Sequence, residues 1–306
     1  MSYIVSILTG VVLVLFISGC ANTSEGEYTY RWSQDRVETL QLSNGISLRY
    51  VRTGTGQPLV LLHTIRTQLD YFEKLVPELS GQYQVYALDL PGHGQSSLPP
   101  VDYTEEFLRQ TVKEFMTRLD LKDATLVGES IGGVLALTVA AELPDRVKRV
   151  VSLNPYDYGE DFGGGIRRSR SGWMVGLFQV FGPYTFEPRF ITAAVLGGGF
   201  HDASRLPEKM LTEFSRTGQR DGYRRAEYSV FKNWTTWVEA RQLYSRVAVP
   251  VTFIYGNEDW SNPEERWRNR QAIAHSKLMT IEKSGHFTAL ENPGEVADII
   301  LSGRSP

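Results

Sequence analysis

The alternation of apolar and polar positions divides most of this 306-residue chain into short apolar runs separated by longer amphipathic segments. Short continuous apolar runs are typical of strands that are buried on both faces of a sheet. They occur at residues 59–62, 85–88, 125–127, 150–153, 251–255 and 278–281. Helical spacing predicts helices between them, as at residues 105–119 and 131–142. The sequence therefore predicts an α/β fold with a mostly parallel β-sheet flanked by helices.

Two segments depart from this alternation. Residues 37–42 and 46–51 are joined by Asn44 and Gly45, a pair that favours the tight turn of a hairpin. Residues 157–243 lack clear strand patterns and are rich in glycine, arginine and aromatic residues. Because this second segment separates two predicted core strands, it predicts an inserted helical cap. The core then consists of two stretches. They are residues 36–156 and 244–306.

Composition and charge narrow the class of protein. With 42% hydrophobic and 22% charged residues the chain is typical of globular proteins, and its net charge of -3 does not indicate a nucleic-acid partner. A basic cluster at residues 167–170 is interpreted as a solvated loop. The single cysteine excludes an internal disulfide, and no histidine has metal-ligand spacing. We therefore expect no metal and no other cofactor.

The N-terminus has the pattern of an export signal. Residues 3–17 are almost wholly apolar and lead into small residues that end at Cys20. Residues 17–20 resemble the lipobox of bacterial lipoproteins, which implies a signal peptide at residues 1–20 with lipidation of Cys20. Residues 21–35 would then be a polar tether. An uncleaved membrane anchor is the alternative. Both place the folded domain in the bacterial cell envelope, facing the periplasm or exterior.

A candidate nucleophile lies in the middle of the chain. Gly128, Ser130 and Gly132 form a G-x-S-x-G motif between a predicted strand and a predicted helix, which is the context that the motif requires. Small residues on both sides let the backbone turn sharply, so that the serine hydroxyl is presented. Since a serine hydroxyl is a poor nucleophile alone, a base must lie near Ser130.

Candidates for the base and the orienting acid follow the last two predicted strands. His286 comes after the final strand and is predicted to be the base. Asp259 follows the preceding strand and is predicted to fix the tautomer of the imidazole and stabilise the imidazolium. Two other acids stay open as alternatives, Glu258 beside it and Asp157 after an earlier strand.

These motifs together resemble the α/β-hydrolase superfamily over residues 37–302. The chain order of the three residues is that of this superfamily and differs from that of chymotrypsin or subtilisin. Residues 89–96 resemble its D-x-P-G-x-G-x-S loop, and residues 286–293 its G-H-F-x-x-x-E-x-P ending. The resemblance implies that Asp89 and His93 are structural.

The same resemblance points to an oxyanion loop at residues 61–65. The backbone N–H groups of Ile65 and Ile131 would hold the developing oxyanion, and one such donor is typically worth about 2.7–4 kcal/mol of barrier. Thr64 stands where the family has glycine. Because threonine does not tolerate glycine's torsions, we expect it to tilt the loop. Arg66 either binds a substrate carboxylate or faces solvent.

The predicted cap contains two apolar clusters, residues 173–181 and the pair Trp234 and Trp237. They either pack on the core and roof the pocket, or line an acyl-binding channel or contact the membrane. Cap segments determine which substrate binds, so the sequence defines the catalytic residues better than the substrate.

The resulting hypothesis is a membrane-tethered, extracytoplasmic serine hydrolase that cleaves a small-molecule carboxylic ester through an acyl-enzyme. A serine at position 130 argues against epoxide hydrolase or dehalogenase chemistry, since those relatives have an aspartate there. The same three residues would also serve an acyltransferase, a C–C hydrolase or an aminopeptidase. A non-catalytic ligand-binding protein that keeps the pocket is a further alternative, which the unusual Thr64 favours slightly.

Overall fold

The computed structural model describes residues 36–184 and 188–303. The predicted signal peptide with Cys20 and the predicted tether lie outside the described residues. Within the described ranges, no helix is both long enough and apolar enough to cross a membrane.

The described chain forms one eight-stranded sheet with the strand order β1-β2-β4-β3-β5-β6-β7-β8. The strands are β1 (Val37–Gln41), β2 (Ser47–Thr53), β3 (Gln57–Leu62), β4 (Tyr83–Leu88), β5 (Ala124–Glu129), β6 (Val147–Leu153), β7 (Val251–Gly256) and β8 (Ser276–Ile281). Strands β1 and β2 are antiparallel to their neighbours, whereas β4, β3 and β5 to β8 are parallel to one another. The predicted mostly parallel sheet is confirmed.

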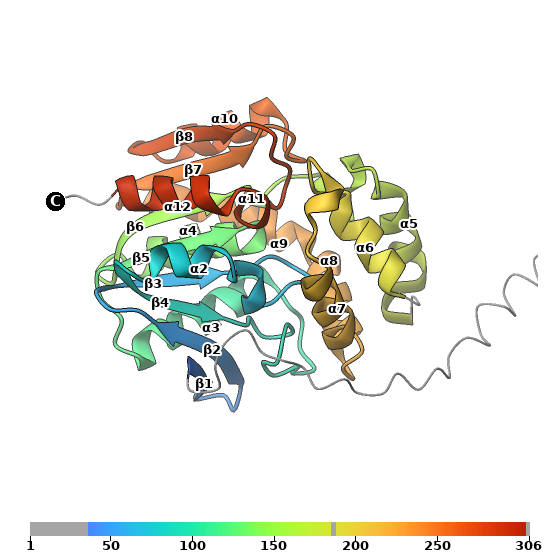
Figure 1. The fold of residues 1–306 in the computed structure, drawn as a ribbon, viewed down its shortest axis with the longest axis horizontal. Helices are drawn as coiled ribbons and strands as arrows, with labels where there is room; N and C mark the ends of the chain where they lie inside the picture. The colour runs from blue at the N-terminus through green and yellow to red at the C-terminus, as the bar shows by residue number, and fades with distance from the viewer. Residues whose placement is uncertain (1–35, 185–187, 304–306) are drawn as a thin grey trace, which may run out of the picture. The chain divides into compact units, whose positions relative to one another are not determined.

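Helices cover the sheet on both faces, as Figure 1 shows. They are η2 (Leu69–Phe72), α2 (Leu75–Leu79), α3 (Glu105–Arg118), α4 (Ile131–Glu142), α10 (Pro263–Ala272), α11 (Thr288–Glu291) and α12 (Pro293–Ser302). Helix α4 is apolar and buried from Ile131 to Ala141, because it packs on β5 and β6 and is flanked by α3. Strand β5 is buried at every position, as its continuous apolar run predicts.

The described residues between β6 and β7 fold into helices without a strand. The helices are η3 (Gly164–Arg168), α5 (Gly172–Phe181), η4 (Gly182–Tyr184), α6 (Arg189–Gly197), η5 (Ala203–Arg205), α7 (Glu208–Thr217), α8 (Tyr223–Lys232), α9 (Trp234–Glu239) and η6 (Ala240–Arg246). Figure 1 shows α5 to α8 beside the ends of the strands. By contrast α9 and η6 pack against α3 and α4, so Trp237 is fully buried within the helical layer of the core.

The strand register brings the loops of the predicted site together. Leu62 at the end of β3 lies opposite Gly128 in β5, and Glu129 lies opposite Leu153 in β6. Gly256 at the end of β7 lies opposite Ile281 in β8. Ligands of open α/β sheets bind outside the carboxyl ends of the strands. The loops after β3, β5, β7 and β8 all leave from that edge.

Candidate active site

Ser130 occupies a sharp turn between β5 and α4. Its backbone has φ 59° and ψ -119°, a conformation that residues other than glycine rarely adopt. The flanking glycines make this turn possible, because a Cβ at Gly132 would lie 2.1 Å from the Leu62 carbonyl oxygen. A Cβ at Gly128 would lie 2.0 Å from the carbonyl oxygen of Gly132. The turn presents the Ser130 hydroxyl at the carboxyl edge of the sheet.

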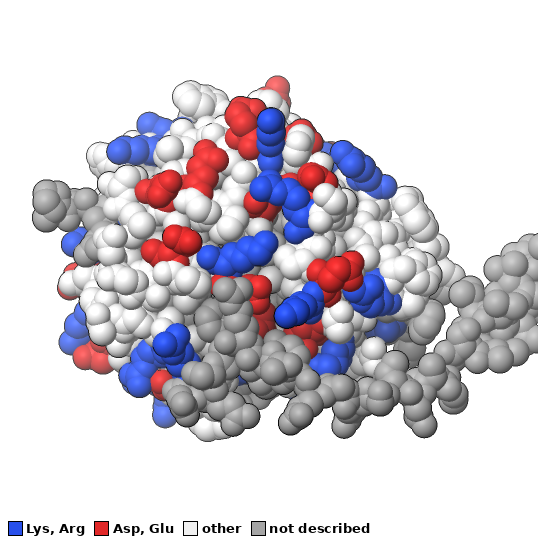
Figure 2. All heavy atoms as spheres, in the orientation of Figure 1, with Lys and Arg blue, Asp and Glu red and all other residues white. Residues whose placement is uncertain are grey.

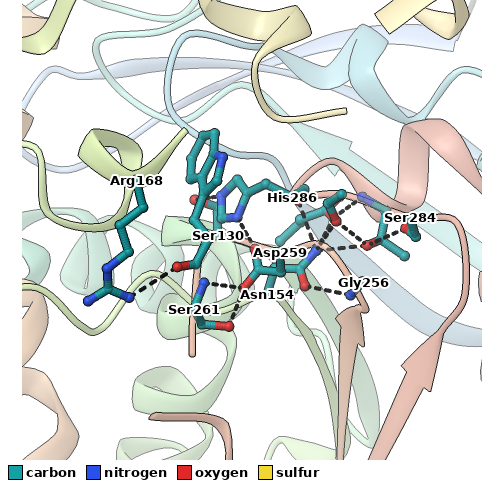
Figure 3. A network of polar contacts seen from close by, with 12 residues as sticks. Ser130, Asn154, Arg168, Gly256, Asp259, Ser261, Ser284 and His286 are labelled. Carbon is teal, nitrogen blue, oxygen red and sulfur yellow. Dashed lines mark hydrogen bonds and ion pairs between the residues drawn. The ribbon is translucent and has the colours of Figure 1, made fainter. Parts of the chain in front are cut away.

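The three residues predicted to act together form one hydrogen-bonded chain (Figure 3). The Ser130 Oγ lies 2.9 Å from His286 Nε2, and His286 Nδ1 lies 2.5 Å from Asp259 Oδ1. All three side chains are buried. The Asp259 carboxylate accepts the Nδ1 proton, so Nε2 is free to accept the serine hydroxyl. This is the geometry of an activated serine nucleophile.

The charge of Asp259 is held by its neighbours. Burial by itself would raise its pKa, but the His286 imidazole and the hydroxyl and N–H of Ser261 keep the pKa below its ordinary value. The Ser261 N–H donates to Asp259 Oδ2 over 3.0 Å, and the Ser261 hydroxyl donates to the same oxygen. Asp259 is thus a carboxylate suited to stabilising an imidazolium.

Neither alternative acid contacts the imidazole in the described structure. Glu258 lies at the surface, where its carboxylate is 2.6 Å from His201 Nδ1. Asp157 is buried elsewhere, accepting hydrogen bonds from the Tyr244 hydroxyl at 2.6 Å and from Asn269 Nδ2 at 2.8 Å. Of the three candidate acids, Asp259 is therefore the one that the fold brings to His286.

Two contacts around the imidazole were not predicted from the sequence. The Trp260 ring stacks on His286 with a centroid separation of 3.8 Å and an interplanar angle of 13°. Arg168 donates to the Trp260 carbonyl oxygen and pairs with Glu265 over 2.7 Å. The basic cluster is therefore more than a solvated loop, since one of its arginines braces the segment that carries the acid.

A second buried network joins the loops from behind. Asn154 Nδ2 donates to the His286 carbonyl oxygen at 2.8 Å, and its Oδ1 accepts the Gly256 N–H at 3.0 Å (Figure 3). Glu129, which directly precedes the nucleophile, accepts the Thr288 N–H at 2.6 Å and a bond from Asn154 at 3.2 Å. Glu129 and Asn154 thus tie the serine turn to the loops of Asp259 and His286.

The oxyanion loop is held by hydrogen bonds to one of its backbone carbonyl oxygens, that of Thr64. Thr64 O accepts from His63 Nδ1 at 2.7 Å and from the Thr67 hydroxyl at 2.8 Å, while His63 Nε2 accepts the Leu90 N–H at 3.0 Å. In a trans peptide the next N–H points opposite to this oxygen, so these bonds orient the Ile65 N–H. Burial lowers the pKa of His63 to about 4, which keeps it neutral.

The donors at Ile65 and Ile131 remain available. Neither N–H has a hydrogen-bond acceptor among the described residues, and both residues line one small apolar cavity. The expected conflict at Thr64 does not arise, because the positive φ of this loop falls on Arg66, at 64°. Thr64 therefore needs none of glycine's torsions.

Comparison with known proteins places the chain in a family. The sequence model described as alpha/beta hydrolase fold matches residues 57–293, a range that holds all three residues of the hydrogen-bonded chain. The chain belongs to the alpha/beta hydrolase fold family. It is 27% identical over 250 residues to the uncharacterized hydrolase YugF of Bacillus subtilis, covering 80% of this chain and 88% of that protein.

Solved structures of this family share the fold. The meta-cleavage product hydrolase CumD of Pseudomonas fluorescens superimposes with a TM-score of 0.74 at 20% identity, covering 87% of this chain and 96% of that one. A bacterial membrane phospholipase A gives a TM-score of 0.71 at 20% identity, covering 87% of this chain and 84% of that one. At such identities the likeness establishes the fold alone.

Arg66 does not face solvent freely in this hydrolase, and it lines the cavity between α5 and α6. Its Nε lies 2.8 Å from the Glu227 carboxylate of α8, and both side chains are largely buried. The ion pair links the oxyanion loop to the cap segment. The solvent-facing alternative is therefore wrong, whereas contact with a substrate carboxylate stays a prediction.

The space beside the nucleophile is small and apolar. A cavity of about 10 Å³ is lined by Ile65, Ile131, Tyr156, Val230, Phe231, Trp234 and Trp237. A second cavity of about 80 Å³ shares Phe231 and extends between α5 and α6. The first has room for about one water molecule, whereas ligand pockets typically measure about 300–1,000 Å³.

Among the described residues, no group of three or more His, Cys, Asp or Glu side chains is placed to hold a metal ion. The polar groups that converge on the site are the hydroxyl, the imidazole, the carboxylate and the two free N–H groups.

Above about pH 8, where Glu129 is a carboxylate, we expect Glu129→Gln to lower kcat by as much as about 10²-fold with little change in KM, because an amide cannot accept all the donors that hold the His286 loop. Glu129 does not line the cavities, so substrate binding should be spared. Steady-state kinetics on a p-nitrophenyl ester measure both constants. The exposed Glu264→Gln is the matched control, and equal kcat values for the two variants would contradict the positioning role.

The same residue predicts a pH dependence of stability. Burial raises the pKa of Glu129 from 4.5 to about 8, although the Tyr71 hydroxyl and the Ala289 and Thr288 N–H groups oppose the shift. Between these values the folded chain binds more protons than the unfolded chain, so its free energy of unfolding falls as pH rises and levels off above about pH 8. Glu129→Gln lacks this contribution. Urea unfolding of both proteins across that interval should show their difference changing with pH, and a constant difference would refute the titration.

Thr64→Val should raise the free energy of unfolding by about 1 kcal/mol. The Thr64 hydroxyl is buried without a hydrogen-bond partner among the described residues, and an unsatisfied buried polar group costs about 1–3 kcal/mol. Thr67→Val is the matched comparison, since it removes a hydroxyl that does donate, and should be destabilising. Urea denaturation measures the free energy of unfolding of both variants. An equal loss of stability in the two would argue against an unpaired Thr64 hydroxyl.

Proposed function

We propose that the chain is a serine hydrolase that cleaves a carboxylic ester and is held at a bacterial membrane by its N-terminus. The observation that carries the enzymatic part is the chain of contacts at 2.9 Å and 2.5 Å from the Ser130 hydroxyl through His286 to Asp259. A protein that only binds ligands has no need of this alignment. Its presence therefore supports catalysis over a non-catalytic role.

The proposed reaction has two halves. Ser130 Oγ attacks the ester carbonyl carbon while His286 Nε2 takes the hydroxyl proton, and the N–H groups of Ile65 and Ile131 stabilise the oxyanion. The imidazolium, paired with Asp259, returns the proton to the leaving alcohol and an acyl-enzyme remains. Water then attacks this ester, again through His286, to release the carboxylic acid.

The cavities support an apolar acyl group. The one beside Ile65 and Ile131 exposes only apolar surface, and the second is mainly apolar as well. Because they share the Phe231 wall, an acyl chain bound at the nucleophile would extend between α5 and α6. Substrates with longer aliphatic acyl groups are therefore proposed over acetate esters.

A fluorescent phosphonate and p-nitrophenyl esters of increasing chain length test the proposal on the full chain. The folded protein should be labelled, hydrolyse the esters, and prefer medium or long acyl groups. Folded protein that is neither labelled nor active would reject the enzyme. Products formed with an added acceptor alcohol separate hydrolysis from acyl transfer, since a transferase would yield the new ester in preference to the free acid.

The membrane tether rests on the sequence of residues 1–20, with Cys20 as the lipidated residue and the cell envelope as the location. Metabolic labelling with an alkyne analogue of palmitate should label the chain, and Cys20→Ser should remove the label. Membrane retention of wild type without any label would instead favour the uncleaved anchor.

A further inference from the structure

Helix α5 is apolar on two sides, and one of them faces outward. Met174, Val175 and Phe178 are buried beneath it, where they line the larger cavity. Trp173 and Val180, on the opposite side, are 66% and 76% exposed. Burial within this chain explains the first set but leaves the second in contact with solvent.

The exposed side continues into the neighbouring turn and helix. Six of the nine large hydrophobic side chains that are exposed in the described chain lie between residues 173 and 190. We call these six the cap face: Trp173, Leu177, Val180, Phe181, Tyr184 and Phe190. In Figure 2 the right-hand edge of the molecule, where α5 lies in Figure 1, is mostly uncharged. Large exposed hydrophobic side chains that are concentrated in one segment are a mark of an interaction site.

Arginine is the predominant charged residue in the segment that carries the cap face. The sequence of residues 162–198 contains four arginines and one acidic residue, although the chain as a whole is acidic. Arg167, Arg168 and Arg189 have acidic partners, while Arg170 is exposed with no ion pair among the described residues. Aromatic and aliphatic side chains with arginine at their border are the composition of helices that lie in the interface of a bilayer.

One residue of the cap face also lines the larger cavity. Leu177 is 44% exposed and at the same time lines the larger cavity between α5 and α6. This cavity shares Phe231 with the pocket of the two oxyanion donors. An apolar surface that meets solvent on one side and the acyl cavity on the other suits a lipid better than a protein partner.

We infer that the cap face docks on a lipid bilayer with anionic headgroups, which places the opening between α5 and α6 against the acyl chains. The inference takes the membrane tether from the proposed function, but it does not depend on esterase activity. A tether at residues 21–35 spans at most about 50 Å when extended at ~3.3–3.6 Å per residue, so the domain stays near the surface. Docking of the cap face would then fix the orientation of a domain that the tether already attaches to the membrane.

Depth-dependent quenching tests this orientation. In the lipidated chain the sulfur of Cys20 is blocked by its lipid, so an introduced cysteine is the only free thiol, and Val180→Cys or Met279→Cys can each carry one fluorophore. Met279 is 40% exposed on β8, away from the cap face. With vesicles of phosphatidylcholine and phosphatidylglycerol that contain nitroxide-labelled acyl chains, the label at 180 should be quenched several-fold more strongly than the label at 279. Equal quenching at both positions would overturn the inference.

Paired variants then ask whether the apolar side chains cause the docking. Trp173→Glu combined with Phe190→Glu should reduce quenching at 180 to the level at 279. Trp267→Glu, at a tryptophan on α10 that is 58% exposed, should leave the quenching at 180 unchanged. All three positions are exposed, so the thermal unfolding midpoint should be preserved. A fluorescence shift at 180 that grows with protein concentration without vesicles would instead assign the cap face to contact between copies and reject a lipid partner.

Ser130→Ala separates this inference from the proposed activity. The variant should show the quenching of wild type at position 180 while its kcat falls by on the order of 10⁶. Docking without activity in wild type would reject the esterase and keep the surface, whereas activity without preferential quenching at 180 would keep the enzyme and reject the surface.

Discussion

Replacement of Ser130 by alanine should abolish ester hydrolysis, with kcat falling by on the order of 10⁶, as in other enzymes that lose a triad nucleophile. The acyl-enzyme cannot form without the hydroxyl that lies 2.9 Å from His286 Nε2. Residual turnover would then come from the two oxyanion donors and from substrate binding alone. Initial rates on p-nitrophenyl esters and loss of phosphonate labelling measure the effect.

The loss must be chemical and not a consequence of unfolding. Alanine at 130 inherits the backbone strain of serine at φ 59°, so the variant should unfold within about 1 kcal/mol of wild type. Ser302→Ala, which removes a hydroxyl at the exposed end of α12, should keep full activity. If Ser130→Ala retained even a tenth of the wild-type kcat, the nucleophile would have to be another residue.

Ser130, His286 and Asp259 were predictable because a local sequence pattern marks the position of each. Gly128 and Gly132 mark the serine turn, and Asp259 and His286 each follow an apolar run that forms a strand. Parallel strands end at one edge of the sheet, so position after a strand translates directly into position in the site. The oxyanion donors followed from the resemblance to the family's oxyanion loop, and Thr64 does not change that assignment because backbone N–H groups depend little on side-chain identity.

The supporting residues lacked any such signal. Glu129 and Asn154 are polar residues at strand ends, and their partners lie more than 100 positions away in the loop of His286. Arg66 meets Glu227 across a similar distance. Only the folded chain brings such pairs together. The type of a side chain determines which groups it can hydrogen-bond, but not which distant loop will lie next to it.

The apolar cluster at residues 173–181 shows another limit of sequence patterns. Its composition was compatible with packing on the core, with an acyl channel and with membrane contact. The fold gives different roles to different sides of one helix, since Phe178 lines a cavity and Val180 faces outward. A helix that is apolar all round has no amphipathic periodicity to say which side is buried.

Replacement of Asp259 by asparagine should lower kcat by about 10⁴-fold while leaving the fold intact. The amide can offer an N–H to His286 Nδ1, which favours the tautomer with its proton on Nε2 and removes the acceptor for the serine hydroxyl. It also leaves the imidazolium without its counter-charge. Because the 2.5 Å contact to His286 is the basis of this prediction, pre-steady-state acylation rates are the direct measurement.

Asp157→Asn is the matched control, since it is the same chemical change at the other buried aspartate that follows a core strand. Asn269 and Tyr244 both donate to Asp157, so an asparagine there would bring a donor against donors and destabilise the fold by about 1–3 kcal/mol. Its kcat should stay near wild type, because this carboxylate does not contact the imidazole in the described structure. The two variants thus separate catalysis from stability. A reversed outcome, with kcat lost at 157 and kept at 259, would mean that the working enzyme recruits its acid from β6 and that the loop after β7 serves only the fold.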